Sequence, residues 1–336
     1  MARGEWVTHS TQEIRDHPVV RTEDLTRQFG NETAVDGLTF EVPDGRIFGL
    51  IGPSGCGKTT TVRLLTGVYA PTKGRAIVLD AEPTGFSQAT RTQIGYMPQR
   101  SVLYPNLSVW ENLRFAGSIY GVPPFARQQL LDVLRFVELE QHRRKRVGHL
   151  SGGMQRRLSL AASLIHGPSL LFLGEPPGGV DPVLRRKFWD HFKTLRDRGK
   201  TLMVTTQYVG EAAYCDLVGV MMAGKLIVVD TPEGLRRRAF GGEVISLKTR
   251  QYLEYSTIQA IREIDGLEHL IPVSNTQLRL VVDDASVALP RLIRYADELD
   301  IDVEAAEEYQ PPYDDVFVRL VERENRGGQG GWGNND

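Results

Sequence analysis

Residues 52–59 read GPSGCGKT and match the phosphate-binding loop pattern G-x-x-x-x-G-K-[ST]. The apolar run IFGLI at residues 47–51 precedes the loop and predicts a strand, and residues 60–65 continue as a helix. This strand–loop–helix setting is the context that the motif requires, whereas a chance glycine-rich turn would lack it. The loop therefore predicts a fold in which backbone N–H groups and the start of a helix cradle phosphate oxygens.

The loop also carries two side chains with specific chemistry. Lys58 is expected to reach the outer phosphates, and Thr59 to ligate Mg²⁺ through its hydroxyl. The helix that begins near Lys58 adds the positive end of its dipole. Cys56 either fills space in the loop or, at a helix N-terminus, forms a thiolate that is sensitive to oxidation. The predicted nucleotide-binding residues of the loop are Gly52, Pro53, Ser54, Gly55, Cys56, Gly57, Lys58, Thr59 and Thr60.

Strands and helices alternate along much of the chain. Residues 19–42 carry short alternating runs with a turn at Gly30 and Asn31, which predicts a β-hairpin. Further strands are predicted at residues 77–79, 94–97, 170–173 and 201–205. Helices are predicted over most of residues 105–149, and at residues 151–165 and 182–198. This alternation implies an α/β fold with parallel strands joined by crossover helices.

The alternation breaks near residues 238–243, in the segment RRRAFGGE, which predicts a domain boundary. We expect a large domain at residues 18–240 and a small α+β domain at residues 241–323. The first 17 residues are predicted to be a flexible arm, and residues 324–336 a disordered glycine-rich tail.

Composition excludes several classes of protein. No apolar run reaches about 18 residues and the N-terminus is polar, so neither a membrane span nor a signal peptide is predicted. Two cysteines are too few for a disulfide framework and fit a reducing cytosol. The net charge of −2 and the lack of aromatic residues among the basic runs argue against nucleic acid as a partner. The basic run HRRKR at residues 142–146 is expected to be a solvated face or to lie near anionic lipid.

A second motif, LSGGMQRR at residues 150–157, resembles the signature of the ABC (ATP-binding cassette) ATPases. Ser151 is suited to cap a helix, and Gly152 and Gly153 allow close approach of the backbone to an anion. In that family the motif closes over the γ-phosphate bound to the opposite subunit. The resemblance therefore implies a head-to-tail dimer, of like or unlike cassettes, with ATP and Mg²⁺ at its interface.

Other elements of that family follow in order. Phe29 resembles the aromatic residue that stacks on adenine, although one aromatic residue beside a hairpin turn is also compatible with a core position. Gln99, in GYMPQ, resembles the Q-loop glutamine that contacts Mg²⁺ and senses the membrane partner. Glu175 matches the catalytic base, and Asp181 ends a segment similar to the D-loop. The resemblance covers residues 19–238 and implies a RecA-like core, an antiparallel β subdomain and a helical subdomain at about residues 100–165.

The sequence departs from the family at three positions. Gly174 stands where most members carry the aspartate that holds the Mg²⁺ shell, so slower hydrolysis is one hypothesis. Pro177 replaces a threonine and gives a stiff Pro-Pro segment. Gln207 stands at the switch position, where most members carry histidine; its amide can still donate a hydrogen bond to the γ-phosphate. We therefore assign catalytic roles to Glu175, Gln207 and Lys58, and metal contacts to Thr59 and Gln99.

Two functions are compatible with this sequence. The first is the ATPase subunit of an exporter, and the second is a degenerate cassette that binds ATP with negligible hydrolysis. The closing segment PPYDDVFVRL and the small domain before it resemble the ABC-2 type exporter ATPases, although a generic amphipathic terminal helix is an alternative. That resemblance implies a separate ABC-2 type membrane permease as partner and a cytoplasmic position on the inner face of the cell membrane. Residues 103–120, and Tyr104 and Leu107 in particular, are candidates for contact with that permease.

Overall fold

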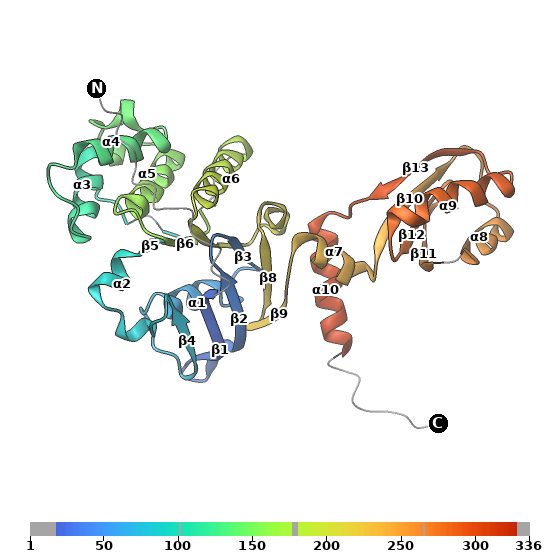
Figure 1. The fold of residues 1–336 in the computed structure, drawn as a ribbon, viewed down its shortest axis with the longest axis horizontal. Coiled ribbons are helices and arrows are strands. Elements are labelled where there is room, and N and C mark those ends of the chain that lie inside the picture. The colour runs from blue at the N-terminus through green and yellow to red at the C-terminus, as the bar shows by residue number, and fades with distance from the viewer. Residues whose placement is uncertain (1–17, 101, 177–180, 265, 328–336) are drawn as a thin grey trace. The chain divides into compact units, whose positions relative to one another are not determined.

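The computed structural model describes residues 18–100, 102–176, 181–264 and 266–327, with side chains up to residue 323. It contains two compact units, Met1–Val229 and Asp230–Asp336, drawn in Figure 1. The predicted N-terminal arm and most of the predicted glycine-rich tail lie outside the described residues. No helix in the described part of the chain combines the length and apolarity that a membrane crossing needs.

A six-stranded sheet forms the centre of the first unit, in the order β5-β6-β7-β3-β8-β9. Its strands are β3 (Ile47–Ile51), β5 (Ile94–Met97), β6 (Leu170–Gly174), β7 (Thr201–Thr206), β8 (Leu217–Met222) and β9 (Lys225–Asp230). The pairs from β5 through β8 are all parallel, as predicted for the strands at residues 47–51, 94–97, 170–173 and 201–205. Every residue of β3, β6 and β7 is buried, because helices or a second sheet cover both faces of the sheet.

A three-stranded antiparallel sheet packs beside this core. It consists of β1 (Pro18–Phe29), β2 (Glu32–Pro43) and β4 (Lys73–Val78), in the order β2-β1-β4. The predicted hairpin turn is confirmed between β1 and β2, where Gly30 adopts a φ of 58°. Helix α1 (Lys58–Leu65) lies in the same hydrophobic core as both sheets. This packing holds the phosphate-binding loop between the hairpin and the central sheet.

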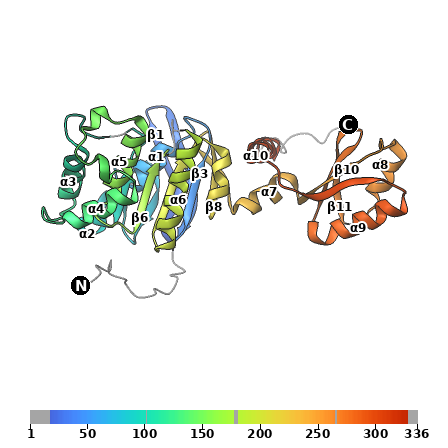
Figure 2. The ribbon, with the colours of Figure 1, turned by 90° about the horizontal axis from the view of Figure 1, so that it is seen from above.

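The remaining helices of the first unit gather mostly at one side of the central sheet (Figures 1 and 2). They are α2 (Gln88–Thr92), α3 (Val109–Ile119), α4 (Arg127–Phe136), α5 (Gly152–Leu164) and α6 (Pro182–Asp197). A capping box of Ser108 and Glu111 starts α3. Between α4 and α5 the chain forms only 3-10 turns (Glu140–His142 and Val147–His149), so the predicted helical content of residues 105–149 is partly wrong there. The run of charged residues at 142–146 has too few apolar positions to bury a helix face.

The second unit is an α+β fold built on a four-stranded antiparallel sheet. The sheet order is β11-β12-β10-β13, from β10 (Glu243–Thr249), β11 (Leu267–Ser274), β12 (Gln277–Val282) and β13 (Val303–Tyr309). Helices α8 (Tyr255–Arg262) and α9 (Ala285–Glu298) bury a separate hydrophobic core against it. Helices α7 (Pro232–Phe240) and α10 (Tyr313–Gly327) pack together in the same unit. The compact unit thus starts at Asp230, and the predicted boundary at residue 240 falls at the end of α7.

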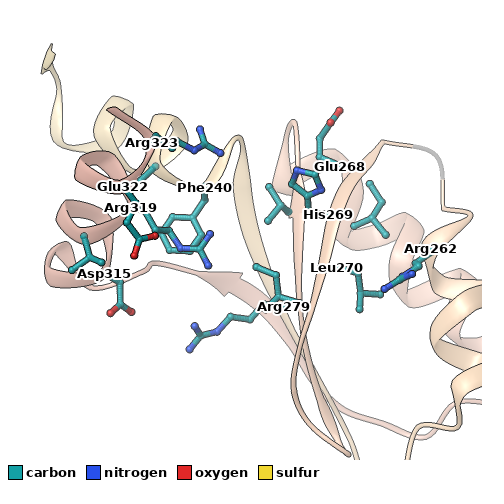
Figure 3. A pocket seen from close by; sticks show the side chains of 15 residues that line it. Phe240, Arg262, Glu268, His269, Leu270, Arg279, Asp315, Arg319, Glu322 and Arg323 are labelled. Carbon is teal, nitrogen blue, oxygen red and sulfur yellow. The ribbon is translucent and has the colours of Figure 1, made fainter. Parts of the chain in front are cut away.

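A cavity of about 1010 Å³ opens in the second unit between the α7–α10 pair and the sheet (Figure 3). Phe240, Arg319 and Glu322 face it from the helices, and Leu270 and Arg279 face it from the sheet. The Arg319 guanidinium lies 4.1 Å from the centre of the Phe240 ring. None of the predicted site residues lines this cavity, so the nucleotide chemistry must be sought in the first unit.

Candidate functional site

The phosphate-binding loop joins β3 to α1, and its conformation depends on glycine. Gly57 has a φ of 107°, and a Cβ there would lie 2.3 Å from the Ala34 carbonyl oxygen. A Cβ at Gly55 would meet nothing within 4 Å, so the space in front of the loop is open. A glycine-rich loop with open space before it, at the start of a helix, can bind phosphate oxygens through backbone amides.

Lys58 is buried within the loop that it is predicted to serve. Its side chain is 4% exposed, and its Nζ donates to the carbonyl oxygens of Gly52 at 2.7 Å and Pro53 at 2.9 Å. Thr59 and Thr60 follow in the first turn of α1 and are half-buried. The ammonium group is therefore fixed at the mouth of the loop, where a phosphate oxygen can replace a carbonyl oxygen as its partner.

Cys56 is held in the same loop with its sulfur 3.8 Å from Lys58 Nζ. Burial raises the pKa of the Cys56 thiol, although the neighbouring Lys58 opposes this effect. A raised pKa disfavours the thiolate, which is the reactive form. The structure thus supports the space-filling role and not the oxidation-sensitive one.

Glu175 follows directly after β6 and is half-buried. Its backbone adopts a left-handed φ of 44° and its amide donates to the Thr205 carbonyl oxygen at 2.9 Å. Gln99, two residues after β5, donates from Nε2 to the Glu175 Oε2 atom at 2.9 Å. The predicted base and the predicted Q-loop glutamine are therefore brought into direct contact, because β5 and β6 are parallel neighbours.

Gln207 follows β7 at the same edge of the sheet. Its Oε1 accepts a hydrogen bond of 2.6 Å from the Ser54 hydroxyl of the phosphate-binding loop. The amide group of Gln207 is exposed, so its N–H donors remain available to a ligand. Four parallel strands thus end in four segments that carry site residues, and the loop after β3 is one of them.

Ser151, Gly153 and Asp181 have structural roles that can be seen directly. Ser151 caps α5 by accepting from the Met154 amide at 3.3 Å, and Asp181 caps α6 by accepting from the Leu184 amide at 2.9 Å. A Cβ at Gly153 would lie 2.4 Å from Leu184 Cδ2, so the start of α5 packs tightly against α6. Ser151, Gly152 and Asp181 are exposed and are not seen to touch the phosphate-binding loop among the described residues.

Phe29 lies at the end of β1 and is 40% exposed. Its ring meets Tyr69 edge-on at 5.3 Å between centroids, and the Arg27 guanidinium lies 4.6 Å from it. A partly exposed ring of this kind can stack on an adenine base. Pro177, and Gly179 and Val180 of the predicted D-loop, lie outside the described residues.

Gly174 ends β6, is buried, and has no side-chain oxygen to offer a metal ion. Among residues 18–100, 102–176, 181–264 and 266–327, no group of three or more His, Cys, Asp or Glu side chains is placed to hold a metal. The Thr59 hydroxyl and the Gln99 amide oxygen remain as the predicted protein ligands. This sparse donor set fits Mg²⁺, which keeps several waters and binds nucleotide phosphates through few protein groups.

Arg156 is a residue of the site that sequence reasoning missed. It lies on α5, and its guanidinium donates to the carbonyl oxygens of Pro98 and Glu175, both at 3.3 Å. Burial lowers the pKa of Arg156, and the nearby Glu175 carboxylate opposes that shift. Its place inside LSGGMQRR was visible, but its partners come from distant segments that only the fold brings together.

Sequence reasoning also missed a buried ion pair in the segment that follows Gln207. Glu211, in the 3-10 helix Val209–Tyr214, is 2% exposed, and its Oε1 lies 3.7 Å from Arg185 Nε on α6. The same guanidinium lies 4.1 Å from the ring centre of Tyr208. Burial raises the pKa of Glu211, while Thr206, Trp189 and Arg185 oppose the rise. Arg185 therefore joins the helix that Asp181 caps to the segment that carries Gln207.

Comparison with known proteins agrees with this geometry. The family model described as "ABC transporter" matches residues 35–178. The chain is 38% identical over 262 residues to a probable multidrug ABC transporter ATP-binding protein of Escherichia coli. That match covers 77% of this chain and 44% of the relative, so the chain spans less than half the length of that protein.

A second relative matches over almost its whole length. A Nod factor export ATP-binding protein of Paraburkholderia xenovorans is 35% identical over 304 residues, which cover 89% of this chain and 96% of that protein. A solved ATP-binding subunit of an ABC transporter superposes with a TM-score of 0.61 and 26% identity, over 66% of this chain and 93% of that one. The chain therefore belongs to the family of ABC transporter ATP-binding proteins.

Proposed function

We propose that this chain is the ATP-binding subunit of an exporter, in which it dimerises around Mg²⁺-ATP and couples hydrolysis to transport through a separate membrane subunit. The observation that carries the proposal is the contact of Gln99 with Glu175 beside the phosphate-binding loop. Family membership and the export named for one relative support the transport role. The degenerate cassette with negligible hydrolysis has no comparable support, because the base and its partner are both in place.

The side chains divide the hydrolytic work between them. The loop amides and Lys58 bind the outer phosphates. Mg²⁺ would be held by Thr59 and Gln99 together with nucleotide oxygens, and would neutralise the charge of those phosphates. Glu175 accepts a proton from the attacking water as general base. The Gln99 amide orients that carboxylate by donating to one of its two oxygens, which leaves the other free for the water.

Gln207 acts on the phosphate and not on the water. Its Oε1 is engaged by Ser54, so its N–H groups donate toward the γ-phosphate oxygen. A glutamine amide stays neutral at all physiological pH values, unlike the histidine that it replaces. Gln207 at the switch position therefore contributes a hydrogen bond whose strength does not depend on pH.

The dimer is supported by the exposure of its two complementary parts. Ser54 and Gly55 of the phosphate-binding loop are exposed, and so are Ser151 and Gly152 of the signature motif. The start of α5 adds the positive end of a helix dipole. A head-to-tail dimer would place that helix start of one copy against the nucleotide on the other.

An apolar patch supports a membrane subunit as the second partner. It contains Tyr104 and Phe115, which are 49% and 43% exposed, and further exposed apolar residues lie near it in the sequence: Val102, Ile119 and Phe125. Tyr104 and Phe115 meet edge-on with ring centroids 5.0 Å apart. Exposed apolar clusters mark interaction sites, and this one follows the Q-loop along the chain. We assign it to a helix of an ABC-2 type permease; with that partner the chain would lie on the cytoplasmic face of the cell membrane.

Steady-state release of phosphate from Mg²⁺-ATP by the purified chain tests this function. The wild type is expected to turn over, and Glu175→Gln to lower the rate by about 10²–10⁴-fold with ATP binding retained. Retained binding controls for folding of the variant. A wild-type rate equal to that of Glu175→Gln would instead identify a cassette that binds ATP without hydrolysing it.

A further inference from the structure

The end of β6 touches the Q-loop (residues 98–100) through its backbone. Met97 of β5 pairs with Leu173 of β6, so the chain that leaves β5 passes directly beside Gly174. A Cβ at Gly174 would lie 2.8 Å from the Gln99 backbone nitrogen, 3.2 Å from the Met97 carbonyl oxygen and 3.3 Å from the Pro98 carbonyl carbon. All three neighbours are backbone atoms, so no side-chain rotation can relieve the contact.

Glycine is therefore required at this position for the observed path of the chain. Its φ is not in the left-handed region, so the requirement comes from space and not from backbone conformation. Any larger residue at 174 must push the Q-loop away from β6 or displace the end of the strand. The glycine that departs from the family pattern is thus matched to a close approach of backbone to backbone.

Three segments are joined by hydrogen bonds beside this contact. Gln99 Nε2 donates to Glu175 Oε2, and Arg156 donates to both Pro98 and Glu175. Gln99 is exposed and Glu175 is half-buried, so neither side chain is fixed by packing. The hydrogen bond between them depends on how closely the Q-loop backbone crosses β6.

We propose that Gly174 is a positioning residue for hydrolysis: by lacking a Cβ it lets the Q-loop lie against β6 and so holds the Gln99 amide on the Glu175 carboxylate. This inference rests on the proposed role of Glu175 as general base. On this view the absence of an aspartate at position 174 is not only the loss of a metal ligand, because the Q-loop backbone lies where a side chain at 174 would begin. Restoring an aspartate at 174 would add both a steric contact with the Q-loop and a second carboxylate beside Glu175.

The first test compares Gly174→Ala with Gly85→Ala in steady-state hydrolysis. Gly85 is exposed, has an ordinary φ and would meet nothing within 4 Å of an added Cβ, so its substitution is a matched control. We expect Gly174→Ala to lower kcat by about tenfold to a hundredfold, because displacement of a positioning group by about 1 Å is that costly. The KM for ATP should change little, because the phosphate-binding loop is untouched. An unchanged kcat in Gly174→Ala would overturn the proposal.

A double-mutant cycle tests whether the effect passes through Gln99. Gln99→Ala should lower kcat at least as much, because it also removes the proposed metal contact, and the double variant should lose little more than Gln99→Ala alone. Additive losses would show that Gly174 acts by another route and would overturn the proposal. If Gly174→Ala does not fold, Gln99→Ala alone must still lower kcat; an unchanged kcat there has the same consequence.

Amide hydrogen exchange separates this inference from the proposed function. Exchange in a peptide covering residues 94–100 should be faster in Gly174→Ala than in wild type, with or without ATP, and unchanged in Gly85→Ala. That result stands even if the wild type fails to hydrolyse ATP. Equal exchange in wild type and Gly174→Ala, or a higher kcat in Gly174→Asp than in wild type, would contradict the assigned role.

Discussion

Arg185 and Glu211 form an ion pair with Nε and Oε1 3.7 Å apart, in which the carboxylate is almost fully buried and the guanidinium is partly exposed. Arg185 is the cation paired with this carboxylate, and the neighbouring Thr206 and Trp189 side chains also favour its charged form. The pair links α6 to the segment after Gln207, so its loss should affect both stability and the switch.

Arg185→Ala should destabilise the first unit by about 1–3 kcal/mol, because it leaves the Glu211 carboxylate buried without a cation. This figure is below that for a fully buried pair, since the Arg185 side chain is 29% exposed. Urea unfolding followed by tryptophan fluorescence measures the change, because Trp189 lies in the same core. Arg186→Ala is the matched control: Arg186 is exposed, and its loss should cost less than about 0.5 kcal/mol. Equal effects of the two substitutions would contradict the assigned role of Arg185.

The raised pKa of Glu211 predicts a pH dependence of stability with a definite sign. Burial keeps the carboxyl protonated in the folded chain at pH values where the unfolded chain has already released the proton. The stability that this proton confers is present below the usual glutamate pKa of 4.5 and is lost as pH rises through the raised value. Wild type should therefore lose stability relative to Glu211→Gln as pH increases from about 4.5 toward neutrality. If the difference in unfolding free energy between the two proteins stays constant across this pH range, Glu211 has an ordinary pKa.

Substitution of Gln207 should separate hydrogen bonding from titration at the switch. Gln207→Ala removes a donor to the γ-phosphate and should lower kcat by about tenfold or more. Gln207→His should keep activity but add a pH-dependent step near the histidine pKa of about 6.5. Rates measured from pH 6 to 8 check both expectations, with wild type as the reference that lacks this step. A wild-type step that persists in Gln207→Ala would have to come from another group.

Much of the first unit was predictable because its signals are local. The phosphate-binding loop at residues 52–59 and the capped start of α5 are each written in one short segment, and the apolar runs of β3 and β6 are uninterrupted. Gln99 and Glu175 were each predicted from the resemblance, but their mutual hydrogen bond was not, because it depends on the parallel pairing of β5 and β6. Motifs of this kind constrain the fold as strongly as they constrain the chemistry.

The rest depended on contacts between distant segments. Arg156 and Arg185 look like ordinary helix charges, and only the fold places them against Glu175 and Glu211. β13 reads as a solvated acidic stretch because it is an edge strand with most of its side chains exposed, yet its backbone pairs with β10. In the sequence Gly174 indicates only the loss of a metal ligand, whereas the structure shows backbone atoms of the Q-loop close to it. Sequence alone therefore located the site but not the residues that support it.

The position of Arg156 has a consequence for how a pair of these subunits would share their work. The residue lies in the second turn of α5, the helix whose first residues would face the nucleotide held by the opposite copy. Its other contacts are the Q-loop and the Glu175 backbone of its own copy. In the proposed dimer, α5 would face the opposite nucleotide with its first residues, while Arg156 contacts the hydrolytic centre of its own copy. Binding of nucleotide at one site would then be coupled to the hydrolytic centre of the other copy through α5, and the two sites would hydrolyse ATP in a coordinated way.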